Sequence, residues 1–366
     1  MPNSAAALAR TVLSRNLRVR KGESVLIETW SHSLDYAPAF VEEARRLGAQ
    51  PTVLYEDEGA YWNAVEAKQF GPFAHLSKAE KAAVGNAGAY VYFWGPAAMR
   101  RAMDLGPSVG ERLTAFNEEW YAAAAKGTLR GCRMSLGLAS EPTAKGFGLD
   151  LGEWRRRLVD AGAVDSSVLL AKGERLRRHL EHGKELTLRH PNGTNLTIPL
   201  RKPTTRVDSG LVTPDARRRP FGVMANNPTG QVFATLDGSK SSGTLVGNRP
   251  VYNMVSYEKS TAGSWEFQGG KLTQHEMTQG EEAFESAFQA APKGREQLSY
   301  ISIGTNPRSR ELAPCEDTEE GAVLVGIGGN SGFGGKLQIP FQGYAMVGGA
   351  TVEIDGRTVI RGGKVL

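Results

Sequence analysis

A glycine-rich loop between two apolar runs, within Gly321–Gly349, constrains the fold of this chain more than any other stretch. The runs VLVGI and YAMV are typical of buried strands, and the loop between them has glycine at 328, 329, 332, 334 and 335. Glycine accepts positive φ and close backbone approach, so the segment predicts a strand, a tightly turned loop and a second strand. The loop is either a set of tight turns or the wall of a cavity whose polar groups are Asn330, Lys336, Gln342 and Tyr344. It does not match a phosphate-binding loop, because neither GxGxxG before a helix nor GxxxxGK[ST] can be placed in it.

The chain has 366 residues, enough for two domains that each bury a core. Its 44 basic and 39 acidic residues give a net charge of only +5. The arginines gather in short patches at 155–157, 175–178 and 217–219, which are typical of solvated helix faces and loops. No basic surface with interspersed aromatic residues is indicated, so a nucleic acid partner is not expected.

Cysteine usage and hydropathy indicate a cytoplasmic protein. Cys132 and Cys315 lie far apart and form no pair with metal-ligand spacing, which is simplest in a reduced, cytosolic protein. The N-terminal stretch has no apolar signal-peptide core, and no window approaches membrane-spanning length. A membrane partner is therefore not expected.

The first half reads as repeated β/α units, which form an open sheet whose strand ends collect binding loops. A strand is predicted at Ser24–Glu28, followed by a short loop and a helix at Leu34–Leu47. The pattern predicts an α/β domain with an open sheet over residues 1–164. Its other strands are expected at Pro51–Tyr55, Tyr90–Trp94 and Gly131–Leu136, and its other helices at Gly59–Lys68, Ser108–Lys126 and Asp150–Ala161, the last capped by Asp150.

Two loops follow strands of this half. His32 lies directly after the first strand, where an open sheet binds ligands, but the favoured interpretation is that Ser33 caps the next helix and His32 is exposed. Glu56, Asp57 and Glu58 follow the second strand. They could bind a metal or act as acid and base, but they are expected to stabilise the positive N-terminus of the next helix.

In the second half, residues 165–366, a charged helix ends near His182. After it the sequence pattern changes to strands separated by tight turns. Pro191, Asn192 and Gly193 lie between two alternating segments, and Asn-Gly is a strong hairpin signal because it accepts positive φ. The remaining pattern predicts a mostly antiparallel α+β domain. Strands are expected at Lys184–His190, Thr194–Leu200, Gln231–Leu236, Thr244–Val246, Ser264–Phe267, Lys271–Glu276, Leu298–Ile303, Ala322–Ile327 and Thr351–Ile354, with a helix at Glu281–Ala291.

Several segments together resemble the aminopeptidase T and aminopeptidase S family of metallopeptidases. They are LARTVLSRNLRVRKGESVLIE, EEARRLGAQPTVLY, NNPTGQVFATLDGSKSSGTL, ISIGTNP, GAVLVGIGGNSGFGG and ATVEIDGRTVIRGG, spread over nearly the whole chain. The resemblance implies a Rossmann-like N-terminal domain, a C-terminal domain with a two-metal site, and a homodimer that encloses the active sites.

The metal ligands of that family do not carry over. By alignment with the family motifs, the ligand positions fall on Gln231, Tyr300, Leu324, Gln342 and Tyr344. Neutral amides, phenols and a leucine do not replace the hydration shell of two divalent ions, so no metal is expected there. A related branch resembles dihydroxypyridine dioxygenases with a two-histidine, one-carboxylate iron site, which needs histidines that this region lacks after His275.

These observations predict a metal-independent, hydrolase-like enzyme of aminopeptidase-like fold, without a cofactor, acting on an amide- or carboxylate-containing small molecule or a peptide. A buried Lys336 with a lowered pKa would act as base, and Tyr344 or Tyr300 would donate a proton. Alternatives are a catalytically inactive pseudopeptidase that only binds, with these residues filling an abandoned cavity, and a metal-dependent aminopeptidase with displaced ligands such as Asp237 or Glu276. The expected substrate-binding residues are Gln231, Gln342, Asn330 and Asn306.

Overall fold

A computed structural model describes residues 2–218, 222–253 and 258–366, and the chain forms two compact units. Unit 1 contains the residues up to Ser166 and the segment Gly210–Pro228. Unit 2 contains Ser167–Ser209, Thr229–Asn253 and Glu258–Leu366. The sequence predicted a single boundary between two domains, at residues 164/165. It did not anticipate the return of Gly210–Pro228 to unit 1, which occurs because strand β8 (Met224–Asn227) pairs with β4 (Arg130–Met134).

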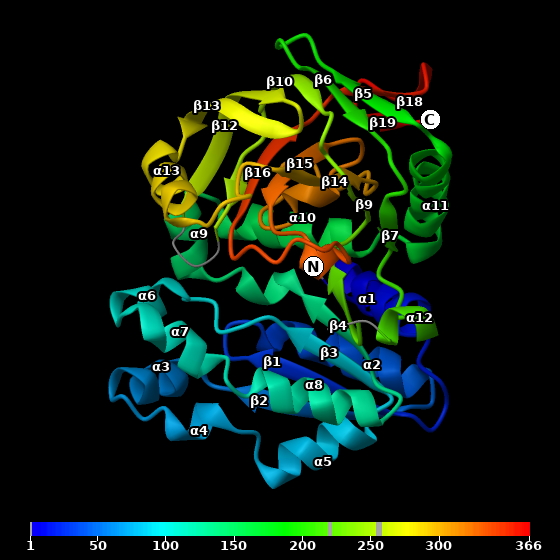
Figure 1. The fold of residues 1–366 in the computed structure, drawn as a ribbon. Coiled ribbons are helices and arrows are strands. Elements are labelled where there is room, and N and C mark those ends of the chain that lie inside the picture. The colour runs from blue at the N-terminus through cyan, green and yellow to red at the C-terminus, as the bar shows by residue number, and fades with distance from the viewer. Residues whose placement is uncertain (1, 219–221, 254–257) are drawn as a thin grey trace. The chain divides into compact units, whose positions relative to one another are not determined.

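Unit 1 is built on a parallel five-stranded sheet with the order β2-β1-β3-β4-β8 (Figure 1). The chain forms β1 in the interior, moves outward to β2 and then crosses to β3 on the other side of β1. Loops that follow β1 and β3 therefore meet at a switch point of an open sheet, where such folds bind ligands. The predicted strands are confirmed as β1 (Ser24–Trp30), β2 (Gln50–Glu56), β3 (Ala89–Phe93) and β4.

Helices pack against this sheet through apolar side chains. Trp120 and Ala124 of α8 and Val84 of α5 pack with Leu26 and Tyr90 on one face of the sheet. Asp150 caps α10 as predicted, since its side chain accepts a hydrogen bond from the Glu153 amide. The helices of unit 1 are α1 (Pro2–Arg10), α2 (Ala37–Arg46), α3 (Glu58–Glu66), α4 (Gly71–Ala74), α5 (Lys78–Asn86), α6 (Arg100–Asp104), α7 (Pro107–Leu113), α8 (Asn117–Lys126), α9 (Glu141–Phe147), α10 (Leu151–Gly162) and α12 (Pro214–Arg217).

The single helix predicted at Ser108–Lys126 is wrong, because α7 and α8 are separated by a turn. Thr114 directs its hydroxyl back to the carbonyl oxygens of Gly110 and Glu111. Such a bond competes with the helical pattern, and the chain leaves the helix at this residue.

Unit 2 contains two sheets. Sheet C is antiparallel, with the order β16-β15-β14-β9-β7, and sheet B has nine strands, including the confirmed hairpin of β5 and β6. The strands of sheet C are β7 (Thr204–Asp208), β9 (Gln231–Thr235), β14 (Leu298–Gly304), β15 (Val323–Gly328) and β16 (Gln342–Val347). Those of sheet B are β5 (Glu185–Arg189), β6 (Asn195–Pro199), β10 (Ser242–Val246), β11 (Val251–Tyr252), β12 (Lys259–Gln268), β13 (Lys271–Gln279), β17 (Thr351–Ile354), β18 (Arg357–Arg361) and β19 (Lys364–Val365).

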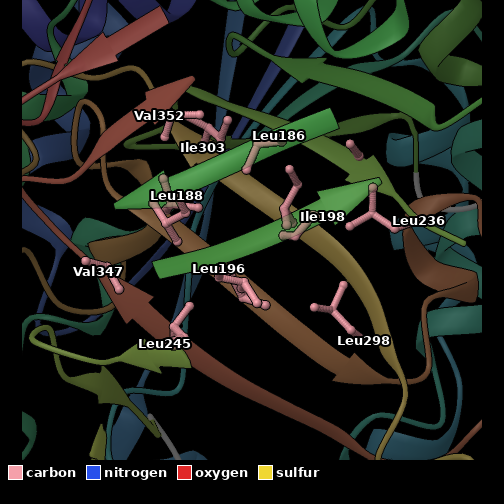
Figure 2. Packing of buried hydrophobic residues seen from close by; sticks show 14 of the residues in the cluster. Leu186, Leu188, Leu196, Ile198, Leu236, Leu245, Leu298, Ile303, Val347 and Val352 are labelled. Carbon is pink, nitrogen blue, oxygen red and sulfur yellow. The ribbon is translucent and has the colours of Figure 1, made fainter. Parts of the chain in front are cut away.

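The core of unit 2 lies between the two sheets. Figure 2 shows Leu186 and Leu188 of β5 and Leu196 of β6 in the same cluster as Ile303 and Val347 of sheet C. Side chains from α11 (Ser166–His182) and α13 (Glu281–Ala290) complete the cluster. One face of sheet C is thus committed to this apolar core, and its other face carries Tyr300, Leu324 and Met346 in a second, smaller buried cluster. The fold is α/β in unit 1 and mostly antiparallel α+β in unit 2, as predicted.

Among the helices of the described ranges, none combines the length and the apolar character that crossing a membrane requires.

Candidate functional site

Side chains expected to form the site lie on the face of sheet C that points away from the apolar core. The register pairs Tyr300 with Gly326, and Gly326 with Tyr344. Directly paired residues of antiparallel strands point to the same face, and so do residues two apart along one strand. Gln231 on β9 and Gln342 on β16 therefore share this face with the two tyrosines, and so does Leu324. The five positions that the resemblance aligns with metal ligands are all on one face of one sheet.

Tyr300 and Tyr344 are both withdrawn from solvent. Tyr300 is fully buried, and its ring packs on that of Phe333 with centroids 4.5 Å apart. Burial, followed by the charge of Asp317, raises the pKa of Tyr344, and burial raises the pKa of Tyr300 well above its ordinary value. Both phenols are therefore neutral at pH 7 and able to donate a hydrogen bond. Gly326 makes room for Tyr300, because a Cβ atom at this glycine would lie 2.2 Å from the Tyr300 ring.

The two glutamines already have hydrogen-bond partners within the protein. Gln231 is buried, and its Oε1 accepts a bond from the Ser302 hydroxyl at 3.2 Å. Gln342 is exposed, and its Nε2 donates to the carbonyl oxygen of Gly329 at 2.8 Å. Gln231 is thus a buried residue of this face, whereas Gln342 fixes the end of the glycine-rich loop.

The expectation of a buried Lys336 is wrong, because this side chain is exposed on the loop between β15 and β16. The loop glycines explain the difference. Gly335 lies against Asn330, where a Cβ would come 2.0 Å from Oδ1, so the chain turns tightly around Asn330 and carries the lysine outward. The burial on which the expected catalytic role of Lys336 depended is therefore not found.

Asn330 and Asn306 are buried and bonded to backbone at both ends of their amides. Asn330 donates to the carbonyl of Ser299 at 3.0 Å and accepts from the amide of Leu337 at 2.9 Å. Asn306 donates to the carbonyl of Thr229 at 2.8 Å and accepts from the amide of Arg308 at 3.0 Å. These contacts indicate that both asparagines fix loop conformations.

We call the face of sheet C that carries Gln231, Tyr300, Gln342 and Tyr344 the polar face. Carboxylates that were not predicted as site residues lie next to it. Asp208 on β7 is the register partner of Gln231. Asp317 belongs to a 3₁₀ turn at Glu316–Thr318, and burial together with repulsion from Asp208 raises its pKa to about 6. Burial and the charge of Asp317 raise the pKa of Glu316 to about 8. The run CEDTEE is visible in the sequence, but only the fold brings Asp317 and Asp208 together.

Arg206 is the cation on this face of β7. It lies over the ring of Phe233 at 4.8 Å from the centroid, and its Nη2 is 3.5 Å from the nearer carboxylate oxygen of Asp208. Phe233 stacks in turn on Phe333. The face therefore combines carboxylates, a guanidinium, phenols and an amide around an aromatic patch.

Asp208 and Asp317 bring carboxylates to this face, and the five aligned positions supply two amides, two phenols and a leucine. Within the described ranges, the one group of three or more metal-binding side chains with ligand atoms within 4.8 Å is His275, Glu281 and Glu285, which lies outside sheet C. Asp237 and Glu276, considered as displaced ligands, are both exposed and do not belong to that group.

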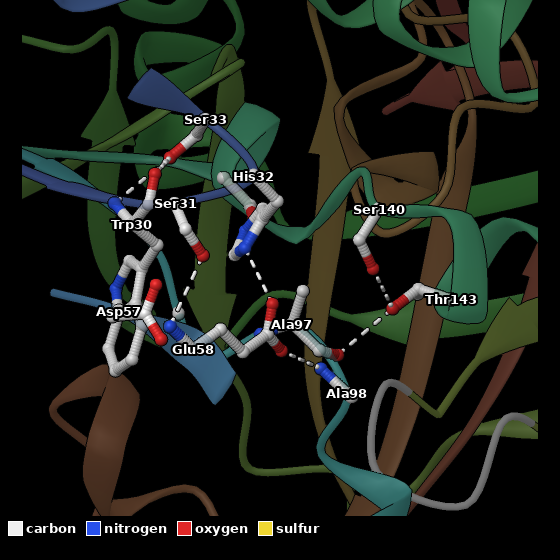
Figure 3. A network of polar contacts seen from close by, with 12 residues as sticks. Trp30, Ser31, His32, Ser33, Asp57, Glu58, Ala97, Ala98, Ser140 and Thr143 are labelled. Carbon is white, nitrogen blue, oxygen red and sulfur yellow. Dashed lines mark hydrogen bonds and ion pairs between the residues drawn. The ribbon is translucent and has the colours of Figure 1, made fainter. Parts of the chain in front are cut away.

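The loop after β1 in unit 1 differs from the favoured interpretation. His32 is not exposed, since its Nδ1 lies 2.6 Å from a carboxylate oxygen of Glu58 (Figure 3). Its Nε2 lies 2.5 Å from the carbonyl oxygen of Gly137. Glu58 also accepts bonds from the amides of Ala97 and Ala98. His32 and Glu58 thus join loops that follow all four predicted strands.

Helix capping in these loops is only partly as expected. Asp57 caps α3 by accepting from the amide of Ala60 at 2.8 Å, which confirms the expected helix-terminus role for this member of the acidic run. The hydroxyl of Ser33 makes no capping bond and instead contacts the backbone of Trp30. Polar side chains at this edge of the sheet thus connect its loops to one another.

Comparison with known proteins yields structural likeness alone. No family model matches the chain, and no curated protein matches its sequence. Among solved structures, it is similar to wild-type AmpT, an aminopeptidase T from Thermus thermophilus, with 18% identity, a TM-score of 0.69 and coverage of 100% of this chain and 99% of that one. It is also similar to 2,5-dihydroxypyridine dioxygenase from Pseudomonas putida, with 18% identity, a TM-score of 0.56 and coverage of 100% and 98%. The chain therefore has an aminopeptidase-like fold that is also found in a dioxygenase.

Proposed function

We propose that the polar face of sheet C is a metal-independent catalytic site for an amide- or carboxylate-containing small molecule or peptide. The fold supports an enzyme, because the two similar structures named above are those of enzymes. The donor set supports metal independence, since Gln231, Tyr300, Leu324, Gln342 and Tyr344 occupy the positions at which the resemblance expects ligands.

Asp317 is the observation that carries the proposal. A carboxyl group with a pKa of about 6 is ionised at pH 7 yet basic enough to accept a proton, which suits a general base better than an ordinary aspartate. In the proposed reaction on an amide, Asp317 removes a proton from a water molecule that attacks the substrate carbonyl, and it returns that proton to the departing nitrogen as the C–N bond breaks. The neutral phenol of Tyr344 donates a hydrogen bond to the oxygen on which negative charge develops.

Substrate binding follows from the surrounding groups. Gln231 offers an amide that can exchange its bond with Ser302 for one with the substrate. Arg206 offers a guanidinium at the edge of the aromatic patch formed by Phe233 and Phe333. Lys336 has no part in the reaction.

The test is turnover of a panel of peptides, amides and aromatic amides by full-length protein, with and without a chelator. Activity should survive the chelator, and Asp317→Asn should lower kcat by about 100-fold or more, the usual contribution of a general base. Asp237→Asn is the matched control, because it removes an exposed carboxylate of the same unit and should leave kcat unchanged. Chelator-sensitive activity with about two metal equivalents bound per chain would contradict the proposal.

A binding protein without turnover is the second candidate, and the enclosure of Tyr300 favours it. The ring of Tyr300 lies against Phe333 and Gly326, and the amides of Gln231 and Gln342 are already bonded. In that case, members of the panel would raise the melting temperature of the wild type without being consumed, and Asp317→Asn would bind them equally well.

A further inference from the structure

A group of metal-binding side chains lies at the corner between β13 and α13. It consists of His275 on the strand and Glu281 and Glu285 on the helix, and one ligand atom from each lies within 4.8 Å of the others. These three residues take no part in the proposed reaction. In the portion of the chain that the structure describes, this is the only group of its kind.

The local sequence forces these three side chains together. Strand β13 ends at Gln279, and Gly280 takes a left-handed conformation with φ of 81°, so the helix begins at once with Glu281. Glu281 and Glu285 are four residues apart on α13 and therefore share one face of it. The tight turn brings that face against His275 on the preceding strand.

Neighbouring groups hold the three side chains in place. Nε2 of His275 is 2.8 Å from Oε2 of Glu285, and Oε1 of the same carboxylate accepts from Gln289 at 2.8 Å. Oε2 of Glu281 accepts from the amide of Met277 at 2.7 Å. Such outer contacts orient ligands and reduce the entropy that metal binding must overcome.

The imidazole ring itself is fixed by aromatic packing. Its centroid lies 5.2 Å from that of Phe284 and 5.3 Å from that of Phe288. These contacts turn Nε2 toward the carboxylates.

We propose that His275, Glu281 and Glu285 bind one divalent transition metal ion, with zinc or cobalt as the fitting class. One imidazole nitrogen and two carboxylate oxygens, with water in the fourth position, are kinds of ligand that zinc binds in four-coordinate sites. The nitrogen ligand disfavours magnesium and calcium, which prefer oxygen throughout. The ion replaces the proton between His275 and Glu285, and the hydrogen-bonded atoms separate to about 3.3 Å, as two ligand bonds of about 2.0 Å at a tetrahedral angle require.

Metal binding at this corner restrains residues next to the end of the glycine-rich loop. Phe284 and Phe288 contact the ring of Phe341 at 6.2 and 5.7 Å between centroids. Phe341 directly precedes β16, which carries Tyr344 on the face that points away from the apolar core. An ion that ties α13 to β13 therefore restrains the residues that hold Phe341 and the end of the glycine-rich loop.

The test uses full-length protein freed of metal by a chelator and then titrated with cobalt(II) or zinc(II). One equivalent should bind, visible cobalt absorption should appear, and zinc should raise the melting temperature by a few degrees. Glu285→Gln and Glu281→Gln should each weaken binding by about tenfold or more. Glu282→Gln is the matched control, because this exposed carboxylate of the same helical turn is outside the group.

Two outcomes would overturn the proposal. One is the absence of binding in the wild type, and the other is equal affinity in Glu285→Gln, Glu281→Gln and Glu282→Gln. Asp317→Asn separates this site from sheet C, since it should retain the equivalent bound at His275. Because the corner holds one ion that is not part of the reaction, its presence or absence leaves the proposed function standing.

Discussion

The carboxyl groups of Asp208 and Asp317 repel each other, and this repulsion adds to burial in raising the pKa of Asp317 to about 6. The two residues are 109 positions apart in the sequence, on β7 and on the turn before β15. Their proximity places a titrating carboxyl group beside two neutral phenols. It also makes this face of sheet C sensitive to pH.

Asp317→Asn should flatten the pH dependence of stability. Between the ordinary pKa of 3.8 and about 6, the folded state binds more protons than the unfolded state, so the free energy of unfolding falls as pH rises through this window. Asparagine does not ionise, and the variant should be more stable than the wild type above pH 6 by up to about 3 kcal/mol. Urea unfolding at pH 4, 5, 6 and 7.5 measures this, and parallel curves for the two proteins would contradict it.

Glu28 should produce a second pH-dependent loss of stability, in unit 1. Burial raises its pKa from 4.5 to about 7, and the hydroxyl of Tyr90, 2.6 Å away, partly offsets this by hydrogen bonding. The folded state holds the extra proton between these values, so stability declines from about pH 4.5 to 7. Glu28→Gln should remove this decline.

The control for Glu28 is Tyr90→Phe. Loss of the phenol takes away the hydrogen bond that favours the ionised carboxylate, so the pKa of Glu28 should rise further. Carbon-detected NMR titration of the Glu28 carboxyl reports this directly. An unchanged titration midpoint in Tyr90→Phe would rule out the hydrogen bond as a determinant.

Gly326→Ala should destabilise unit 2 by about 1–3 kcal/mol, the cost of overpacking a filled site. The added methyl would lie 2.2 Å from the buried Tyr300 ring, so the ring has to move. Gly332→Ala is the control, because a Cβ there meets nothing within 4 Å. Equal unfolding midpoints for the two variants in urea would show that Tyr300 is not held against this glycine.

Asn330→Ala should loosen the glycine-rich loop and cost about 1–3 kcal/mol, because a buried amide and a buried carbonyl lose their partner. Faster hydrogen exchange at the amide of Leu337 should accompany this loss. Lys336→Ala, an exposed position on the same loop, should change stability by no more than about 0.5 kcal/mol and leave turnover intact. A large loss of kcat in Lys336→Ala would restore this lysine as a catalytic candidate.

Much of the fold was predictable because hydrophobic periodicity and turn chemistry are local. The strand at Ser24–Glu28 and the hairpin around Asn192–Gly193 are found where the pattern placed them. The separate helices α7 and α8 were missed, since the turn between them is short and its one visible signal is Thr114, whose hydroxyl bonds back to the carbonyl of Gly110. Strand β8 was missed as well. It has only four residues and follows a segment of unit 2, so its pairing with β4 specifies it rather than its local sequence.

The sequence by itself determined the two-part architecture, the strand–loop–strand of Gly321–Gly349 and the neutral character of the groups at the aligned ligand positions. Those properties follow from residue type and spacing, which the chain carries wherever it folds. Only the tertiary structure decided that Lys336 is exposed and that Asp208 and Asp317 meet at the polar face. Burial and charge proximity depend on which strands become neighbours, and that depends on long-range pairing across the whole of unit 2.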